Sequence, residues 1–321
     1  ILAWLLACFM VLSVIQGTGW GSLTVQAEEA EKIPTDLEVG TKDEDKVIKD
    51  GAVINREGTG WNYNEITNTL TLTNAYLGDI IYDGGDLNLQ IKGDNTIGQI
   101  DSKENAIYIT GIENGKLACE NICVDTFSIE NIELNASNEI NVKTATVKNV
   151  KLNTSIYLDT NILNCSGSQI DTADRVSVWV SLNCVDSEIR AGKIDDFSAI
   201  KGTYTDSIVV DNKNIITRVY GAATLCEDLT IPSAGTIMFA EGASITNLDK
   251  LTVKEDANIF VNYKMDEYES ESYEKHIHNT EATKGGRYKD SQTHYENVAC
   301  KDCPIGYVTE TKVEREHTYE N

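Results

Sequence analysis

The stretches "LNCSGSQI" at residues 163–170 and "LNCVDSEI" at residues 182–189 are two copies of one pattern, nineteen positions apart. Leu, Asn, Cys, Ser and Ile stand at equivalent places in both copies. A second match lies upstream, where "IELN" at 132–135 returns as "VKLN" at 150–153, a shift of 18. A period near 20 with short strands in each repeat is what a parallel β-helix requires, because every coil stacks its equivalent residues on the coil before.

Short alternations of apolar and polar residues fill the chain between residues 66 and 264. Examples are "TLTLT" at 69–73, "LNLQI" at 87–91 and "AIYIT" at 106–110. This alternation directs side chains to two faces, which is the period of a strand, and no helical spacing continues beyond two turns. The sequence therefore predicts an all-β protein whose residues 51–264 form a right-handed parallel β-helix.

The cysteines of the repeat are expected in one ladder. Cys165 and Cys184 would occupy neighbouring coils, either as buried thiols that pack like small apolar residues or as a disulfide. Both alternatives remain open, although the thiols are favoured. Cys119, Cys123 and Cys226 are also predicted to be core residues.

An N-terminal cap is expected in "GWNYNEITNTLTLTNAYLGD" at residues 60–79, because an open coil end would expose strand edges. Here Trp61–Asn64 can pair with Thr69–Thr73 across the turn between them. This stretch, with "GDLNLQIKGDNTIG" and "AIYITG" after it, resembles the start of secreted β-solenoid surface proteins of Gram-positive anaerobes that are often labelled carbohydrate-binding. The resemblance covers roughly residues 50–112 and implies the fold far more than the function.

The first 27 residues have the pattern of a signal peptide. The run "ILAWLLACFMVLSVI" carries no charge, Val25 and Ala27 occupy the small-residue positions before cleavage, and an acidic stretch follows. The rival interpretation is a transmembrane anchor, but the run is shorter than the roughly 20 residues that a span needs. We expect a bacterial protein that is secreted or held at the cell surface, without membrane insertion after cleavage, and a linker over residues 28–50.

The net charge of −24, from 51 acidic and 27 basic residues, limits which partners the protein can bind. Such a surface repels nucleic acid and anionic lipid. An extracellular polysaccharide or a cell-surface ligand is the expected partner. The favoured function is glycan binding; the alternative is a structural or adhesive surface stalk without glycan specificity.

A polysaccharide lyase or hydrolase is the less favoured function, and no catalytic residue is assigned. No histidine precedes His276, and the Gly-His-Gly and Arg-Ile-Lys signatures of polygalacturonase-like hydrolases are absent. Asp195 and Asp196 are adjacent, so on a strand they point to opposite faces and do not form an acid and base pair.

Aromatic residues are the candidates for contact with sugar rings. The predicted glycan-binding residues are Trp61, Tyr63, Tyr76, Tyr82 and Trp179. The alternatives are that Trp61 plugs the cap and that Trp179 belongs to the core. Asp83 and Asp86 are candidate ligands for calcium, although both residue types are expected at a tight turn without any metal.

The C-terminal tail holds all four histidines and a Cys-x2-Cys motif. An acidic linker at 265–275 precedes a His/Cys module at 276–321, which we expect to continue beyond Asn321. Cys-x2-Cys lets two thiolates bind one tetrahedral zinc from a tight turn, and a Cys300–Cys303 disulfide is the alternative. The predicted ligands of a structural zinc are Cys300, Cys303 and His294, with His278 or His317 as the fourth.

Overall fold

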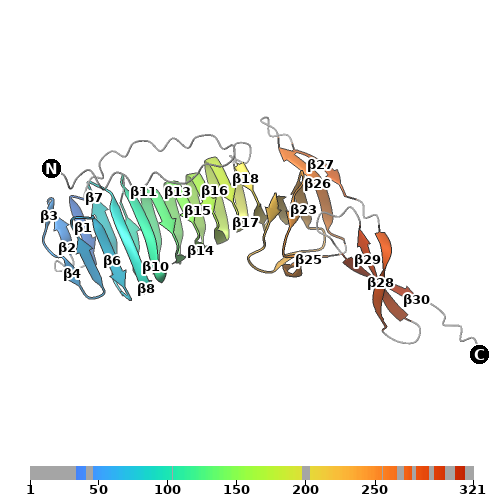
Figure 1. Ribbon diagram of the computed structural model, residues 1–321. Helices are drawn as coiled ribbons and strands as arrows, with labels where there is room; N and C mark the ends of the chain where they lie inside the picture. The colour runs from blue at the N-terminus through green and yellow to red at the C-terminus, as the bar shows by residue number, and fades with distance from the viewer. Residues whose placement is uncertain are drawn as a thin grey trace, which may run out of the picture. The chain divides into compact units, whose positions relative to one another are not determined.

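The computed structural model describes residues 34–40, 46–102, 104–196, 203–254, 256–265, 271–276, 280–288, 293–300 and 308–314. These residues form a β-solenoid of about ten turns, in which parallel coils stack side by side (Figure 1). The predicted fold class is confirmed. No helix among the described residues is long and apolar enough to cross a membrane.

Each coil between residues 69 and 211 crosses three faces in the order first, second, third. Long strands bend at the corners and contribute to more than one face. The first face contains β6 (Thr69–Thr73), β8 (Leu87–Thr96), β10 (Ala106–Cys119), β11 (Asn121–Glu130), β13 (Glu139–Lys148), β15 (Tyr157–Ser166), β16 (Gln169–Val185) and β18 (Thr203–Thr205). The second face adds β12 (Glu133–Ala136), β14 (Lys151–Thr154), β17 (Glu188–Asp196) and β19 (Ser207–Asp211). The third face begins with β7 (Ile80–Asp83) and β9 (Gln99–Asp101).

The register between coils follows the sequence repeat. Cys165 lies directly opposite Cys184, as predicted. The earlier match is confirmed as well, because Leu134 is opposite Leu152. On the first face a single inward ladder runs through Leu70, Leu89, Ile109, Ile129, Val147, Cys165, Cys184 and Tyr204. Like-on-like stacking of this kind buries the apolar side chains away from water and forms a continuous core.

A ladder of residues with left-handed backbone explains why Asn, Asp and Gly recur between the strands. At the corner between the first and second faces, Asn131, Asn149, Gly167, Asp186 and Asp206 all have φ between 47° and 57°. Asn and Asp tolerate this conformation better than other side chains, and Gly has no Cβ to oppose it. The Asn149 amide also donates to Asn131 Oδ1 at 3.2 Å. Each coil therefore turns at the same place.

The N-terminal cap has the predicted hairpin and four strands more than predicted. β5 (Trp61–Asn64) pairs antiparallel with β6, so the expected hairpin is confirmed. The range 28–50, predicted as a linker, contains two paired strands, because "DLEV" and "KVIK" alternate like strands. The additional cap strands are β1 (Asp36–Val39), β2 (Lys46–Lys49), β3 (Ala52–Val53) and β4 (Glu57–Gly58).

A second stack begins where the parallel order is interrupted. β19 pairs antiparallel with β20 (Ile216–Tyr220), since Asp211 accepts the backbone N–H of Asn214 at 3.0 Å and reverses the chain. The expected uninterrupted parallel helix thus contains one hairpin. The second stack has its own apolar core and is made of β20, β21 (Ala222–Ala223), β22 (Leu229–Ile231), β23 (Thr236–Ala240), β24 (Ser244–Ile245), η3 (Leu248–Lys250), β25 (Leu251–Val253) and β26 (Asn258–Met265).

The C-terminal tail contributes further antiparallel strands. β27 (Glu271–Lys275) pairs with β26, so the end of the predicted acidic linker at 265–275 is a strand. β28 (Thr280–Tyr288), β29 (Thr293–Cys300) and β30 (Val308–Glu314) form a three-stranded antiparallel sheet.

Candidate functional site

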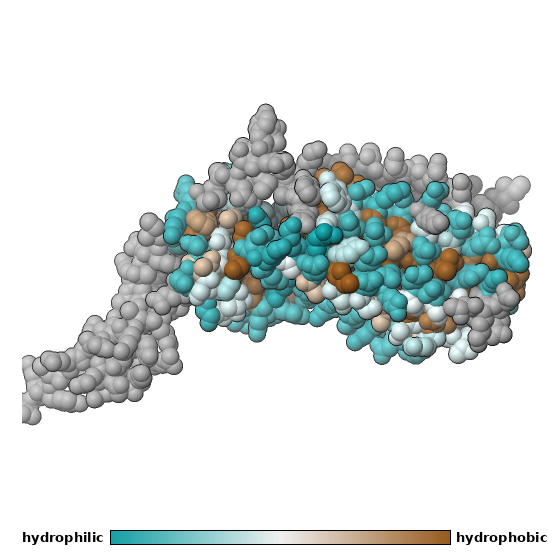
Figure 2. Space-filling view, turned by 180° about the vertical axis from the view of Figure 1, so that it is seen from behind, coloured by the Kyte–Doolittle hydropathy of each residue, from teal (hydrophilic) through white to brown (hydrophobic). Residues whose placement is uncertain are grey.

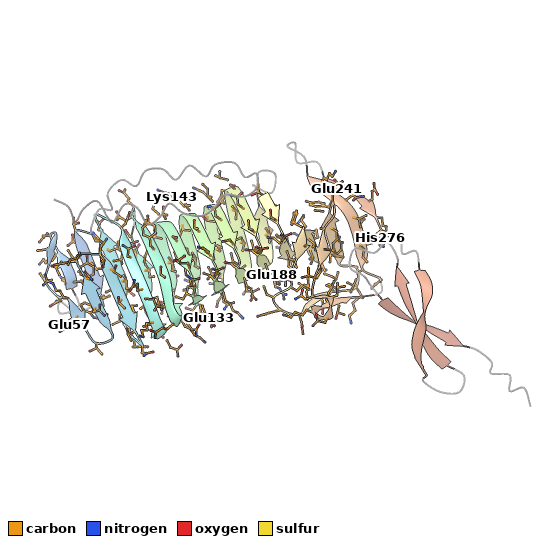
Figure 3. All side chains as sticks on the ribbon, in the orientation of Figure 1. Glu57, Glu133, Lys143, Glu188, Glu241 and His276 are labelled. Carbon is orange, nitrogen blue, oxygen red and sulfur yellow. The ribbon has the colours of Figure 1, made fainter. Side chains whose placement is uncertain are left out.

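A groove of about 740 Å³ runs across successive coils at the corner between the second and third faces. Figure 3 labels Glu133 at the start of β12, a strand that ends in this groove. The lining residues come from equivalent places in six coils. They are Tyr76, Leu77, Thr96, Ile97, Gly98, Ala118, Cys119, Glu120, Asn135, Ala136, Ser137, Asn153, Thr154, Ser155, Asp171, Thr172 and Ala173.

Small side chains make the floor of the groove. Cys119, Ala136, Thr154 and Thr172 are partners in one ladder, and all four are buried. Most other inward positions of the core carry Leu, Ile or Val, which fill the interior. A ladder of shorter side chains at this corner leaves space along the coil axis.

Amide and carboxylate groups form one wall. Asn135, Asn153 and Asp171 are partners in the ladder next to the floor. Asn153 Nδ2 donates to Asn135 Oδ1 at 2.8 Å, which leaves each amide with further donor and acceptor capacity. Gln169 Nε2 donates to Asp171 Oδ2 at 2.7 Å. Burial raises the pKa of Asp171 above its ordinary value, although Gln169 opposes the shift.

The hydroxyl of Thr172 has no hydrogen-bond partner among the described residues, although the residue is only 5 % exposed. Its ladder neighbour Thr154 differs, because that hydroxyl donates to the carbonyl oxygen of Asn138 at 2.9 Å. A buried hydroxyl without a partner loses free energy relative to water, about 1–3 kcal/mol. Thr172 lines the groove, but its hydroxyl oxygen is closed off from solvent, so a ligand would reach it only if the neighbouring side chains moved.

An exposed aromatic ring lies at one end of the groove. Tyr76 is 87 % exposed and is held by a single parallel bridge to Thr96. The face of a phenol ring packs well against the C–H groups of a sugar. Of the five predicted aromatic residues, Tyr76 is the one that lines this groove.

Three of the predicted aromatic residues are buried, so in this structure their rings are not open to a ligand, and their contact with glycan stays a prediction that this burial does not favour. Trp61 and Tyr63 face the interior of the cap, where the Tyr63 hydroxyl donates to Asn68 Oδ1 at 2.9 Å. Tyr82 is buried on β7, and burial raises its pKa. The physical reason is the strand alternation, which places all three on the inward side. The alternative, that Trp61 plugs the cap, agrees with its position.

Trp179 is exposed but lies outside the groove. Its side chain is 51 % exposed on β16, and its Nε1 donates to Asp159 Oδ1 at 2.7 Å. It does not belong to the core, which was the alternative interpretation. Figure 2 shows one face of the molecule as mainly hydrophilic with scattered apolar residues.

The other cysteines divide by burial. Cys119 is buried as predicted, and burial raises its pKa to about 12. Cys123 is half-buried. The core prediction is wrong for Cys226, which is exposed in the loop before β22. Its thiol group is nevertheless partly buried, which raises the pKa of the thiol to about 11, and the nearby Glu188 carboxylate adds to the shift.

The predicted metal ligands are described in part. Asp83 Oδ1 accepts a hydrogen bond from the backbone N–H of Gly84 at 2.7 Å, and Asp86 Oδ1 accepts one from the backbone N–H of Ala106 at 2.8 Å. Both carboxylates therefore stabilise the local backbone conformation. Calcium binding there stays a prediction. No cluster of three or more potential metal-ligating side chains occurs in the part of the chain that the structure describes.

The zinc prediction concerns the tail sheet. His294 and Cys300 lie at opposite ends of β29, and six residues of extended strand span about 20 Å, so this strand does not bring the two together. Cys303, His278 and His317 lie outside the described residues. The structural zinc therefore stays a prediction.

Several residues of the groove were missed by the reasoning from sequence. Asn135 and Asn153 were visible in the repeat, but they read as turn residues. Thr172 and Asp171 carried no signal, because only the stacking of coils shows that they share a corner. Comparison of this chain with models of known protein families, with curated proteins and with solved structures found no match.

Proposed function

We propose that this protein binds an extracellular polysaccharide along the corner groove. The observation that carries the proposal is one groove in which an exposed ring, an amide ladder and a carboxylate line the same space. Sugar binding needs such a combination, because rings pack on aromatic faces while hydroxyls exchange hydrogen bonds with amides. With the signal peptide expected at residues 1–27, we place the protein outside the cell.

The charge of the groove narrows the ligand to an uncharged polysaccharide. Among the residues that the structure describes, the lining contains the carboxylates of Glu120 and Asp171 and no lysine or arginine. The chain as a whole has a net charge of −24. A polyanion such as a pectin would bring like charges together without a basic partner, which costs free energy. Neutral chains avoid this repulsion.

The arrangement favours binding over cleavage. Glu120 follows β10, while Asp171 lies on β16, three coils further along the second face. Three coil spacings amount to about 14 Å, whereas the two carboxyl groups of glycosidases are about 5–9.5 Å apart. We therefore propose no catalytic role for this pair.

The direct test is binding of the full chain to an array of polysaccharides, followed by calorimetry with the best neutral ligand. We expect binding to neutral glycans, no binding to polygalacturonate even at low salt, and no new reducing ends. Tyr76→Ala should weaken binding about fivefold, because an aromatic contact contributes about 1 kcal/mol. Asn153→Ala removes an amide from the wall of the groove, so it should weaken binding as well.

Trp179→Ala is the matched control, since it removes an exposed aromatic residue outside the groove. Binding that survives Tyr76→Ala and Asn153→Ala but is lost with Trp179→Ala would move the site away from the groove. Binding to no glycan at all would contradict the proposal.

A second candidate function, adhesion to another protein, is favoured by one observation. Trp179 and Val180 are adjacent, and about half of each is exposed. Exposed aromatic residues beside aliphatic ones often anchor protein interfaces. In this case Trp179→Ala would abolish attachment to the partner while the groove variants would not.

A further inference from the structure

Two cysteines occupy consecutive places in the inward ladder of the first face. Cys165 on β15 and Cys184 on β16 are direct partners in parallel register. Both side chains are buried, 4 % and 1 % exposed, and their Sγ atoms are 2.8 Å apart. Neither belongs to a disulfide in the structure.

The backbone already has the geometry that a disulfide needs. Neighbouring strands lie about 4.8 Å apart, and disulfides join residues whose Cα atoms are about 4.4–6.8 Å apart. The two Cβ atoms point to the same side because the register is one-to-one, without a bulge at this place. The two Sγ atoms are 2.8 Å apart, so they have to approach by less than about 1 Å to reach the S–S bond length of about 2.05 Å.

Cys119 and Cys123 have no cysteine opposite them in the neighbouring coils. Cys119 is opposite Ala136, and Cys123 is opposite Asp101 and Asn141. Of these four cysteines, only those at 165 and 184 face each other in a ladder.

We propose that Cys165 and Cys184 form a disulfide that ties two neighbouring coils when the chain folds in the presence of a small-molecule disulfide. One thiolate attacks the small disulfide and releases one of its thiols, and the second cysteine then displaces the other thiol. Two protein S–H bonds are lost and one S–S bond forms, while the oxidant is reduced to two thiols. Because both sulfurs are buried, the exchange takes place during folding or local opening.

The expected consequence is a coil pair that resists separation. The bond closes a loop of about 19 residues, and restricting such a loop in the unfolded chain stabilises the folded state. The melting temperature should rise by about 5–10 °C. The effect does not depend on glycan binding, because the pair lies on the first face and outside the groove.

The test uses the full chain, refolded with either oxidised or reduced glutathione. We expect a peptide containing Cys165 linked to one containing Cys184 after non-reducing digestion, and a higher melting temperature in the oxidised sample. Cys165→Ala should abolish both differences, whereas the control Cys119→Ala should retain them. The linked-peptide measurement on the unaltered chain stands even if a variant fails to fold. If both thiols of the oxidised, folded chain can still be alkylated after denaturation, or if either cysteine is linked elsewhere, the proposal is wrong.

Discussion

The two stacks on either side of the β19–β20 hairpin are held together in different ways. In the first stack, ladders of similar side chains continue from coil to coil on three faces. In the second stack, four of the strands are two or three residues long, and the loop before β22 is held by charged side chains of the first stack. The first stack is therefore held together by its own ladders, while the second stack relies on individual polar contacts in addition to its apolar core.

The clamp between the stacks is built around a buried carboxylate. Glu188, labelled in Figure 3, is fully buried and forms an ion pair with Arg190. Its other oxygen accepts the N–H of Cys226 at 2.6 Å. Arg190 donates to the carbonyl oxygens of Glu227 and Asp228 at 2.8 and 2.9 Å. The hydrogen-bond partners of these three backbone groups in the loop are therefore side chains of β17.

Removal of a large core side chain should show the difference in stability between the two stacks most clearly. Phe127 and Phe239 are both buried, one in each core. Each change to Ala should lower the local free energy of unfolding by about 4 kcal/mol through lost burial and a cavity. Hydrogen exchange measured by mass spectrometry should show Phe239→Ala loosening residues 216–265 while the groove keeps its protection. Equal loosening of both stacks in both variants would mean that they open as one unit.

Breaking the clamp should have the next largest effect. Arg190→Ala leaves the Glu188 carboxylate buried without its cation and should cost about 3 kcal/mol. The loss should appear as faster exchange in residues 222–231. The double variant Glu188→Gln, Arg190→Met is the control, because it removes both charges and should recover most of the loss. If Arg190→Ala leaves exchange of this loop unchanged, the clamp contributes nothing.

A glycine-to-alanine substitution where two coils of the first stack come close together should show how tightly these coils fit. A Cβ on Gly115 would collide with the carbonyl oxygen of Ile91 in the preceding coil. Gly115→Ala should therefore cost about 2 kcal/mol in thermal or denaturant unfolding. In the second stack Gly242→Ala meets no atom within 4 Å, and its φ of +73° alone should cost about 1 kcal/mol. The reverse order would show that the first stack relaxes more easily than the second.

The smallest expected effect concerns an exposed ion pair across the stacks. Lys151 Nζ lies 2.9 Å from Glu227 Oε1, and this hydrogen bond lowers the pKa of Glu227 below its ordinary 4.5. A carboxyl group with a lowered pKa stabilises the fold above its unfolded pKa and loses that contribution as the pH falls through its folded pKa. Lys151→Ala should cost less than about 1 kcal/mol at neutral pH. The difference between wild type and variant should vanish on acidification; a difference that grows would contradict the assignment.

The sequence predicted the regular coils better than their interruptions. The repeat at Cys165 and Cys184 predicted their register, because stacked parallel strands must align equivalent residues. The strands at 36–49 were missed because their alternations are only four residues long and were judged without their partners. The hairpin at Asp211 was missed for a similar reason, since a tight turn and a coil corner use the same residue types.

By itself the sequence determined the coil period, the cap hairpin and the acidic surface, since each follows from local spacing, pairing patterns or charge. Only the tertiary structure decided which aromatic residues are exposed and where a ligand could lie. Tyr76 and Tyr82 are six residues apart, yet one lines the groove and the other is buried. The groove itself exists because small side chains from coils about 18 residues apart meet at one corner, and this meeting depends on stacking between coils rather than on any single segment.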